Sequence, residues 1–398
     1  MQKKLWSKEF ISITASSLFN AWAFYALLPT LPLYLLETLK FSHSSVGLII
    51  AAFSVSVILV RPVAGYLADN YNRFVVLVIS LSAATVSYAV YPLTSTVAGI
   101  FMIRLIQGAM FGISTSSSVT IVVDIVPPLQ MGHGIGIYAL TIPLGMTIGP
   151  VFGLKIFQDY SSNMLFIAIF IISFIAILFA LSAKTPLKTI IKNKFSLPNL
   201  FSLKAFPISI CMFFVMIAYG AIIVFVSIYA KQKHFHNVGT FFICFSVTIF
   251  ISRLFAGRLF DKGRIYQLIL SSLIFIAIGI LCFGYAADQI QFLIAGMING
   301  FGFGMLMPTC QAAVNSIVKS SERGAANSTY LLSYDLGIGV GSLVIGFLLD
   351  KISLEEIYRY SIFMIIISAI VFIFIAIPHY YRNKKTISDF HESQSADC

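Results

Sequence analysis

The sequence predicts an all-α polytopic membrane protein with twelve transmembrane helices, grouped in two pseudo-symmetric six-helix bundles around a central cavity. Three observations predict this fold class. Of the 398 residues, 59% are hydrophobic and only 10% are charged, and the mean hydropathy is +0.94. Twelve apolar runs are long enough to cross a bilayer, and the two halves of the chain repeat one pattern. No soluble globular domain of this length needs so much apolar surface.

The apolar runs set the expected elements. A hydrocarbon core about 30 Å thick requires about 20 apolar residues per helix. Such runs lie at approximately 10–36, 44–67, 74–93, 97–125, 133–156, 163–182, 205–230, 239–259, 266–286, 289–318, 324–349 and 358–378. We therefore expect an N-terminal bundle over 1–182, a basic linker over 183–204, a C-terminal bundle over 205–380 and a tail over 381–398.

The basic residues indicate orientation rather than a nucleic-acid partner, although the net charge is +11. Lys and Arg gather in the segments that share one side of the membrane, which by the positive-inside rule places both termini in the cytoplasm. The linker is the richest segment and contains no acid; its lysines are Lys184, Lys188, Lys192, Lys194 and Lys204. We interpret it as a solvated linker facing the lipid of the inner surface of the cell membrane.

Several chemistries are not indicated. Four cysteines fall within predicted spans and Cys398 is terminal, so the spacing predicts neither a disulfide framework nor a metal site. No GxxxxGK[ST] segment occurs, so ATP is not expected to supply energy. We expect no cofactor, no enzymatic activity and a monomer whose partners are a small-molecule solute, protons and membrane lipid.

The two halves match at an offset of 192 residues. RPVAGYLADNYNR at Arg61–Arg73 corresponds to RLFAGRLFDKGRI at Arg253–Ile265. The same offset pairs glycines throughout the chain: Gly108 with Gly300, Gly112 with Gly304, Gly145 with Gly337 and Gly149 with Gly341. Parallel repeats of six helices are typical of transporters that work by alternating access.

The segment after the second span resembles a loop signature of the major facilitator superfamily, through Gly65, Asp69 and Arg73. It departs from that signature at Asn70, Asn72 and Phe74. The second copy retains Gly257, Asp261 and Arg264 but is one residue shorter. The resemblance covers nearly the whole chain and implies a gating role for this loop. We expect Asp124 and the helix start near Gly324 to join it, so that the cluster holds the outward-facing state; an ordinary interfacial charge cluster is the alternative.

Two further motifs resemble the same family. In RLIQG, the resemblance implies a part in proton transfer for Arg104, with Gln107 and Gly108 beside it; a structural arginine bonded to backbone carbonyls is the alternative. The stretch from Gly134 to Gly153 resembles the signature of exporters and antiporters, through Gly136, Gly145, Gly149, Pro150 and Gly153. Glycines four residues apart form one face that admits a neighbouring helix. The second half has Ser342 in place of Pro150, so the exporter signature belongs to the first half.

Asp335 is the candidate coupling residue. It lies eleven residues beyond Gly324, which is about 17 Å along a helix and close to the bilayer midplane. Protonation from outside and release inside would bias the two access states. A salt bridge to a basic group, or solute binding without a proton, is the alternative. Polar residues that suit a cavity, or else contacts between helices, are Asn20, Tyr25, Gln107, Ser114, Asn299, Gln311, Tyr330 and Tyr334.

These features predict a secondary active, proton-coupled exporter of a small organic solute. Arg104 and Asp335 favour an anionic or zwitterionic metabolite, such as a siderophore or an opine-type metallophore. A multidrug/proton antiporter is the first alternative, and an importer of a sugar or another nutrient is the second. A membrane sensor or scaffold would not need two charges inside its spans.

Overall fold

The computed structural model of the chain describes residues 5–127, 130–183, 201–261, 263–318 and 322–384. Within those ranges the side chains of a few helical residues lie outside the description, among them Gly65, Asp69, Gly257, Asp261 and Gly324. Helices account for nearly all the described residues, and no strand occurs among them. The predicted all-α fold class is confirmed.

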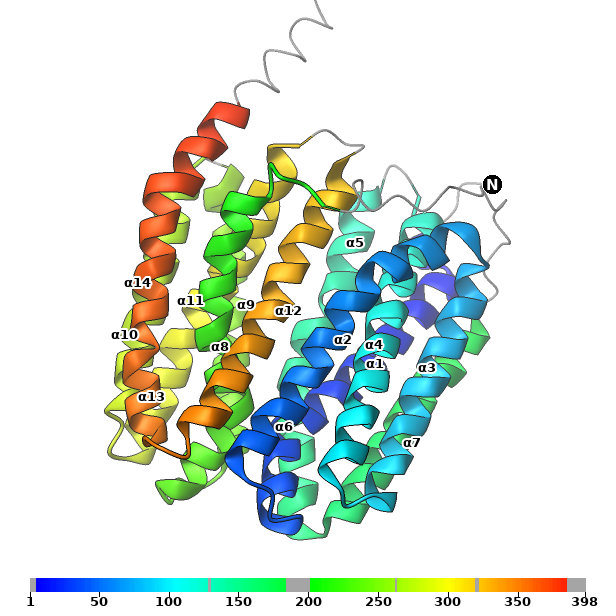
Figure 1. Cartoon of the computed structure of the whole chain (residues 1–398). Helices are drawn as coiled ribbons and strands as arrows, with labels where there is room; N and C mark the ends of the chain where they lie inside the picture. Colours follow the sequence, from blue (N-terminus) through cyan, green and yellow to red (C-terminus); the bar gives the residue numbers. More distant parts are fainter. Residues whose placement is uncertain (1–4, 128–129, 184–200, 262, 319–321, 385–398) are drawn as a thin grey trace, which may run out of the picture. The chain divides into compact units, whose positions relative to one another are not determined.

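The described residues of the first half form seven α-helices and two short helical turns, whose arrangement is drawn in Figure 1. In chain order these are α1 (Lys8–Leu33), η1 (Tyr34–Thr38), α2 (His43–Asn70), α3 (Arg73–Val90), η2 (Tyr91–Leu93), α4 (Val97–Ile125), α5 (Met131–Ala139), α6 (Thr141–Asp159) and α7 (Ser162–Ser182).

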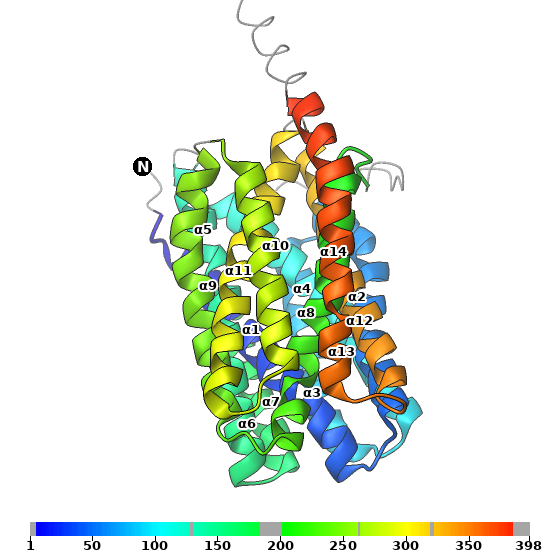
Figure 2. The same cartoon turned by 90° about the vertical axis from the view of Figure 1, so that its left-hand side faces the viewer.

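The described residues of the second half are likewise helical, and most of their helices are labelled in Figure 2. Its elements are α8 (Phe206–Gln232), α9 (Val238–Asp261), α10 (Ile265–Gly284), α11 (Gln289–Ser316), α12 (Arg323–Leu348), α13 (Leu354–Tyr360), α14 (Ile362–Val371) and η6 (Phe372–Ala376).

The helices match the predicted spans. Among the described residues, eleven helical segments are long and apolar enough to cross a membrane, and Val238–Arg253 in α9 is a shorter apolar helix. Polar residues cap the N-termini of several helices. The side chains of Ser42, Thr96 and Ser161 accept a hydrogen bond from a backbone N–H in the first turn of α2, α4 and α7, respectively.

Two predicted spans are interrupted, and the run expected over 358–378 is divided at Ser361 between α13 and α14. The run expected over 133–156 is divided at Leu140 into α5 and α6. Pro143 has no N–H to donate to the carbonyl of Ala139, and its ring crowds that carbonyl. Regular α-helix is therefore disfavoured in the turn that precedes Pro143. Leu140 continues the chain in a helical conformation, and its carbonyl accepts the Leu144 N–H at 3.1 Å.

The chain separates into two compact units. The first contains residues 1–195, 223–231 and 237–243, and the second contains 196–222, 232–236 and 244–398. In the first unit α2 packs on α4, α1 packs on α6 and α7, and α3 packs on α4 and α7. In the second unit α10 packs on α11, α13 and α14, and α11 packs on α12. The domain boundaries drawn from the sequence remain a prediction.

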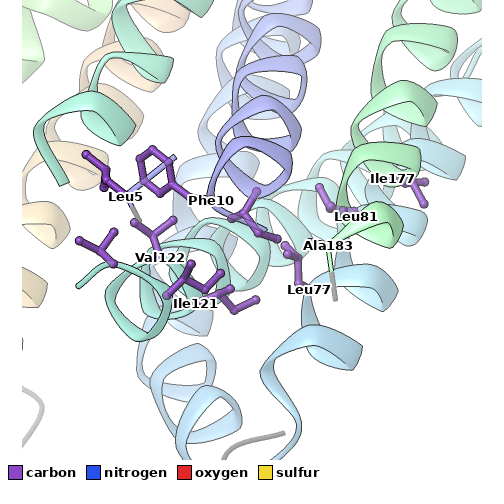
Figure 3. Packing of buried hydrophobic residues seen from close by; sticks show 12 residues of the cluster. Leu5, Phe10, Leu77, Leu81, Ile121, Val122, Ile177 and Ala183 are labelled. Carbon is purple, nitrogen blue, oxygen red and sulfur yellow. The ribbon is translucent and has the colours of Figure 1, made fainter. Parts of the chain in front are cut away.

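A buried apolar cluster joins the ends of four helices in the first unit. Phe10 of α1, Leu77 and Leu81 of α3, Ile121 of α4 and Ile177 of α7 meet there (Figure 3). Phe10 and Leu77 are completely buried. The cluster therefore brings the first turn of α3 to the last turns of α4, where two predicted gating residues lie.

The glycines of α6 form the predicted face, and α1 occupies it. A Cβ placed on Gly145 would lie 2.8 Å from the Cβ of Ala21, and one placed on Gly149 would lie 2.8 Å from the amide nitrogen of Ala26. A Cβ on Gly153 would collide with the Ala26 carbonyl. Contacts this close require glycine, since the atoms in the way belong mostly to the backbone.

Gly149→Ala should therefore destabilise the protein. The added methyl group overpacks the contact between α1 and α6, which costs about 1–3 kcal/mol. This cost exceeds the gain of about 1 kcal/mol in helix propensity. The unfolding midpoint of the purified protein in detergent, measured by circular dichroism, should fall.

The matched control is Gly136→Ala in α5. Gly136 is exposed, and a Cβ there would meet nothing within 4 Å. The unfolding midpoint of the Gly136→Ala variant should stay the same or rise. Equal behaviour of the two variants would contradict the close packing of α6 on α1.

Candidate functional site

A buried cation lies between helices of the first unit. Arg104 of α4 is 1% exposed, and its Nη1 donates to the Gln107 Oε1 at 2.7 Å. The hydroxyl of Tyr91 donates to the same oxygen at 3.1 Å. The Arg104 guanidinium carbon lies 4.6 Å from the ring centroid of Phe53 on α2. A cation against an aromatic face gains about 0.5–2 kcal/mol, which offsets part of the desolvation of the charge.

Local features hold the partners of Arg104 in place. Tyr91 begins the turn η2 that ends α3, and its ring stacks on Phe166 of α7 with centroids 5.0 Å apart. A Cβ on Gly108 would collide with the Phe53 carbonyl. This glycine therefore lets α4 approach α2 closely enough for Phe53 to cover the guanidinium. The sequence singled out Arg104 and Gln107 but missed Tyr91 and Phe53.

An aromatic triad adjoins this cation. Phe24 of α1 lies 4.9 Å from Phe53 and 4.6 Å from Phe111 of α4, measured between ring centroids. Tyr25, a predicted cavity residue, packs edge-on against Phe24 at 5.1 Å. Phe24 and Phe53 are 8% and 7% exposed. The triad is an apolar aromatic surface directly beside a positive charge.

The second unit carries a counterpart of the triad. Tyr219 of α8 lies 4.7 Å from Phe303 of α11 and 6.3 Å from Phe245 of α9. Phe245 and Phe303 stand at the offset of 192 from Phe53 and Phe111. A Cβ on Gly300 would collide with the Phe245 carbonyl, just as a Cβ on Gly108 would collide with the Phe53 carbonyl. The offset was the signal that would have paired Phe53 with Phe245 and Phe111 with Phe303; it does not relate Phe24 to Tyr219, because Met216 stands at the matching position.

Asp335 lies beside the triad of the second unit. It is partly exposed on α12, next to Tyr334, whose ring centroid is 6.3 Å from that of Tyr219. Both Asp335 and Arg253 of α9 act electrostatically on Tyr334. Tyr330, one turn earlier, is 3% exposed and donates to the Met307 carbonyl at 2.9 Å. The second unit thus contains both a carboxylate and a guanidinium near its aromatic cluster.

The remaining predicted cavity residues are dispersed. Asn20 of α1 is 5% exposed, and Ser114 of α4 donates to the Phe111 carbonyl of its own helix. Asn299 of α11 is completely buried, donates to the Ala295 carbonyl at 2.9 Å and packs on α10, where a Cβ on Gly279 would lie 2.6 Å from its Nδ2. Asn299 thus makes a contact between helices.

An amide cluster joins α11 and α12. Asn327 Nδ2 donates to Asn315 Oδ1 at 2.8 Å, and Asn315 Nδ2 donates to Asn327 Oδ1 at 3.2 Å. Gln311, which is exposed, donates to the same Asn327 oxygen at 3.3 Å. Of these three residues, the sequence analysis named only Gln311, as a cavity residue. Asn315 and Asn327 belong to different helices, and only helix packing brings their amides together.

Of the predicted gating residues, Arg73 and Asp124 meet. Arg73 at the start of α3 forms a hydrogen-bonded ion pair with Asp124 in the last turn of α4, and the two side chains are 21% and 18% exposed. Arg264 is exposed before α10. The side chains of Gly65, Asp69, Gly257 and Asp261 lie outside the described residues, so their part in the latch remains a prediction.

A family model described as Major Facilitator Superfamily matches residues 13–236 and 208–395, nearly the whole chain. The chain belongs to the major facilitator superfamily. It is therefore a multi-pass membrane transporter of small solutes, and its relatives are transporters rather than enzymes. This assignment confirms the resemblance seen in the loop, arginine and glycine motifs.

Two curated members of the superfamily align over most of the chain. The staphylopine export protein of Staphylococcus aureus is 21% identical over 354 residues, which are 83% of this chain and 87% of that protein. The multi-drug resistance efflux pump PmrA homolog of Lactococcus lactis is 25% identical over 397 residues, 95% of this chain and 97% of that protein.

A solved superfamily structure shares the fold. It is the crystal structure of a bacterial homolog to the human lysosomal transporter Spinster, in an inward-facing and unoccupied conformation. It aligns with a TM-score of 0.74 and 15% identity, and the alignment covers 97% of this chain and 98% of that one.

The ion pair between Arg73 and Asp124 should stabilise this superfamily member measurably. Each single change, Arg73→Gln or Asp124→Asn, should cost about 1–3 kcal/mol, because it removes a charge-assisted hydrogen bond between two partly buried side chains. The double variant should lose less than the sum, and a double-mutant cycle from unfolding in detergent measures that difference.

The exposed pair Lys204 and Glu322, with 3.4 Å between Nζ and Oε2, is the control. Its side chains are 45% and 43% exposed, so its coupling energy should be about 0–1 kcal/mol. If the two cycles gave the same coupling energy, the stabilising role of the Arg73 pair would be wrong.

Proposed function

We propose that this transporter exports a small organic solute across the cytoplasmic membrane in exchange for protons. Both termini face the cytoplasm, and the protein works as a monomer with no resident cofactor. The energy comes from the transmembrane proton gradient. Export, the coupling ion, the solute and the orientation all belong to this proposal, while membership of the transporter superfamily does not depend on it.

The observation that carries the proposal is the glycine face of α6. Gly145, Gly149 and Gly153 pack on α1 so closely that a side chain on any of them would meet Ala21 or Ala26. This is the segment that resembles the signature of exporters and antiporters. The second unit keeps the close contact at Gly337 and Gly341, where a Cβ would meet α8, but it lacks the proline.

The names of the relatives support the direction. One is named as an exporter of staphylopine and the other as a multidrug efflux pump. Both names describe movement of a small organic compound out of the cell. A nutrient importer is therefore the weaker hypothesis.

Asp335 supports proton coupling. It is a carboxylate within an apolar helix, partly exposed and next to Tyr334. An ionisable group at such a depth is costly and usually serves ion or solute movement. Arg253 on the neighbouring α9 acts on the same tyrosine. A charge partner of this kind would allow protonation of Asp335 to change how the two helices interact.

Features of the first unit support the proposed solute class. Arg104 makes no ion pair with any described residue, which favours an anionic or zwitterionic metabolite such as a siderophore or an opine-type metallophore. The aromatic triad favours the second candidate, a multidrug/proton antiporter, because planar lipophilic compounds stack on such rings.

Comparison of deletion, wild-type and overexpressing cells tests the export function. Untargeted profiling of the medium should reveal a metabolite that disappears on deletion and accumulates on overexpression. A change in drug sensitivity alone would select the multidrug candidate. Growth failure on a single carbon source, with no change in excreted compounds, would overturn export.

Asp335→Asn should abolish proton-driven transport while leaving downhill exchange of the solute. An amide keeps the shape of the side chain but cannot release a proton. Transport of the identified solute into everted vesicles, with and without an imposed pH gradient, measures the difference.

The matched control is Asp288→Asn. Asp288 caps α11 by accepting the Gln291 N–H at 2.8 Å, a role that asparagine also fills. This variant should transport normally. An Asp335→Asn protein with wild-type rate and pH dependence would remove Asp335 from the coupling mechanism.

A further inference from the structure

Two buried side-chain donors of α4, the Nε of Arg104 and the Nε2 of Gln107, make no hydrogen bond of normal geometry with any described residue. The Tyr88 hydroxyl is a described polar group that lies beside the Gln107 amide. Both side chains are 1% exposed, so the donors are enclosed by the bundle. Buried N–H groups nearly always find an acceptor, because leaving them unpaired is costly. An acceptor for this pair is therefore expected.

Arg104 and Tyr91 together fix the direction in which the Gln107 donors point. The Gln107 Oε1 accepts both the Tyr91 hydroxyl and the Arg104 Nη1. If the amide were turned around, its NH2 group would face the cationic donor of Arg104, which has no lone pair to accept it. The two donors thus hold the oxygen on their side and the Nε2 on the other.

The charge of the site selects the kind of acceptor. Arg104 is a permanent cation, and its described neighbours are the Gln107 amide oxygen, the Phe53 ring and the hydroxyls of Tyr88 and Tyr91, none of which carries a negative charge. A guanidinium N–H and an amide N–H together supply positive charge and two donors. A carboxylate offers two acceptor oxygens and the complementary charge.

The second unit lacks this arrangement. At the offset of 192, Gly296 takes the place of Arg104, Asn299 that of Gln107 and Phe283 that of Tyr91. Asn299 bonds back to its own helix. Since the second unit builds its aromatic triad without the cation and without the tyrosine hydroxyl, the fold does not require them.

We propose that Arg104 Nε and Gln107 Nε2 form a receptor for a carboxylate of the transported solute, and that Tyr91 is the positioning residue of this receptor. The proposal rests on the export function proposed above and names the chemical group that the first unit recognises. The carboxylate reaches the donors when the Phe53 ring, which covers the guanidinium, turns aside.

Binding of benzoate and benzamide to the purified protein tests the receptor. The two probes share the aromatic ring and differ in the carboxylate. Benzoate should raise the unfolding midpoint of the wild-type protein in detergent in a saturable way, and benzamide should not. If the two probes shift the midpoint equally, or neither shifts it, the receptor is wrong.

Two variants separate positioning from packing. Tyr91→Phe keeps the ring on Phe166 and removes only the hydroxyl, so benzoate affinity should fall about three- to tenfold, the effect of one hydrogen bond. Gln107→Glu gives Arg104 an internal counter-ion, so the midpoint without probe should not fall while the benzoate shift disappears. Wild-type benzoate affinity in either variant would overturn the proposal. If Tyr91→Phe fails to fold, the benzoate shift of Gln107→Glu alone tests the receptor.

Tyr358→Phe is the control for loss of a buried tyrosine hydroxyl. Tyr358 is completely buried in the second unit and donates to the Ala221 carbonyl at 3.3 Å. This variant should bind benzoate like the wild type. If benzoate binds as expected while cells export nothing, the proposed function fails alone; if export is observed but benzoate and benzamide behave alike, the receptor fails alone.

Discussion

Close approach of helix backbones at glycines is the constraint on which the rest of this structure depends. In a bilayer, helices gain little from the hydrophobic effect when they associate, so they rely on packing at short distance. The α6 glycines meet the backbone of α1, and Gly108 of α4 meets the Phe53 carbonyl of α2. These contacts position α1, α2 and α4 so that Phe24, Phe53 and Phe111 converge.

Duplication repeated this packing in the second unit. Gly300 contacts the Phe245 carbonyl, and a Cβ on Gly304 would lie 2.7 Å from the Cα of Ile249. An aromatic triad follows from the same crossings in each unit. The polar chemistry differs, because the first unit has the buried Arg104 cluster and the second has Asp335 with its tyrosines. Shared packing and divergent charges thus give one repeated fold two different polar environments.

The sequence anticipated much of the candidate site but not its arrangement. Arg104 and Gln107 stood out because a charge and an amide are rare inside an apolar run, and their spacing of three residues places them on one helix face. Phe53 did not stand out among 37 phenylalanines. Tyr91 lies sixteen residues before Gln107, across a turn, and nothing in the local pattern says that its hydroxyl meets that amide. The pairing of Asn315 with Asn327 was hidden for the same reason.

By itself, the sequence determined the apolar spans, the duplication and the glycine face, because hydropathy and spacing are local properties of the chain. The interruption at Leu140 also has a local cause in Pro143, although the run of apolar residues concealed it. Only the tertiary structure decided that α1 covers the glycines, that Phe53 lies on Arg104, and that Tyr91 shares an acceptor with it. These contacts join residues on different helices, and they depend on helix rotation and crossing, which are set by how side chains interlock rather than by their order in the chain.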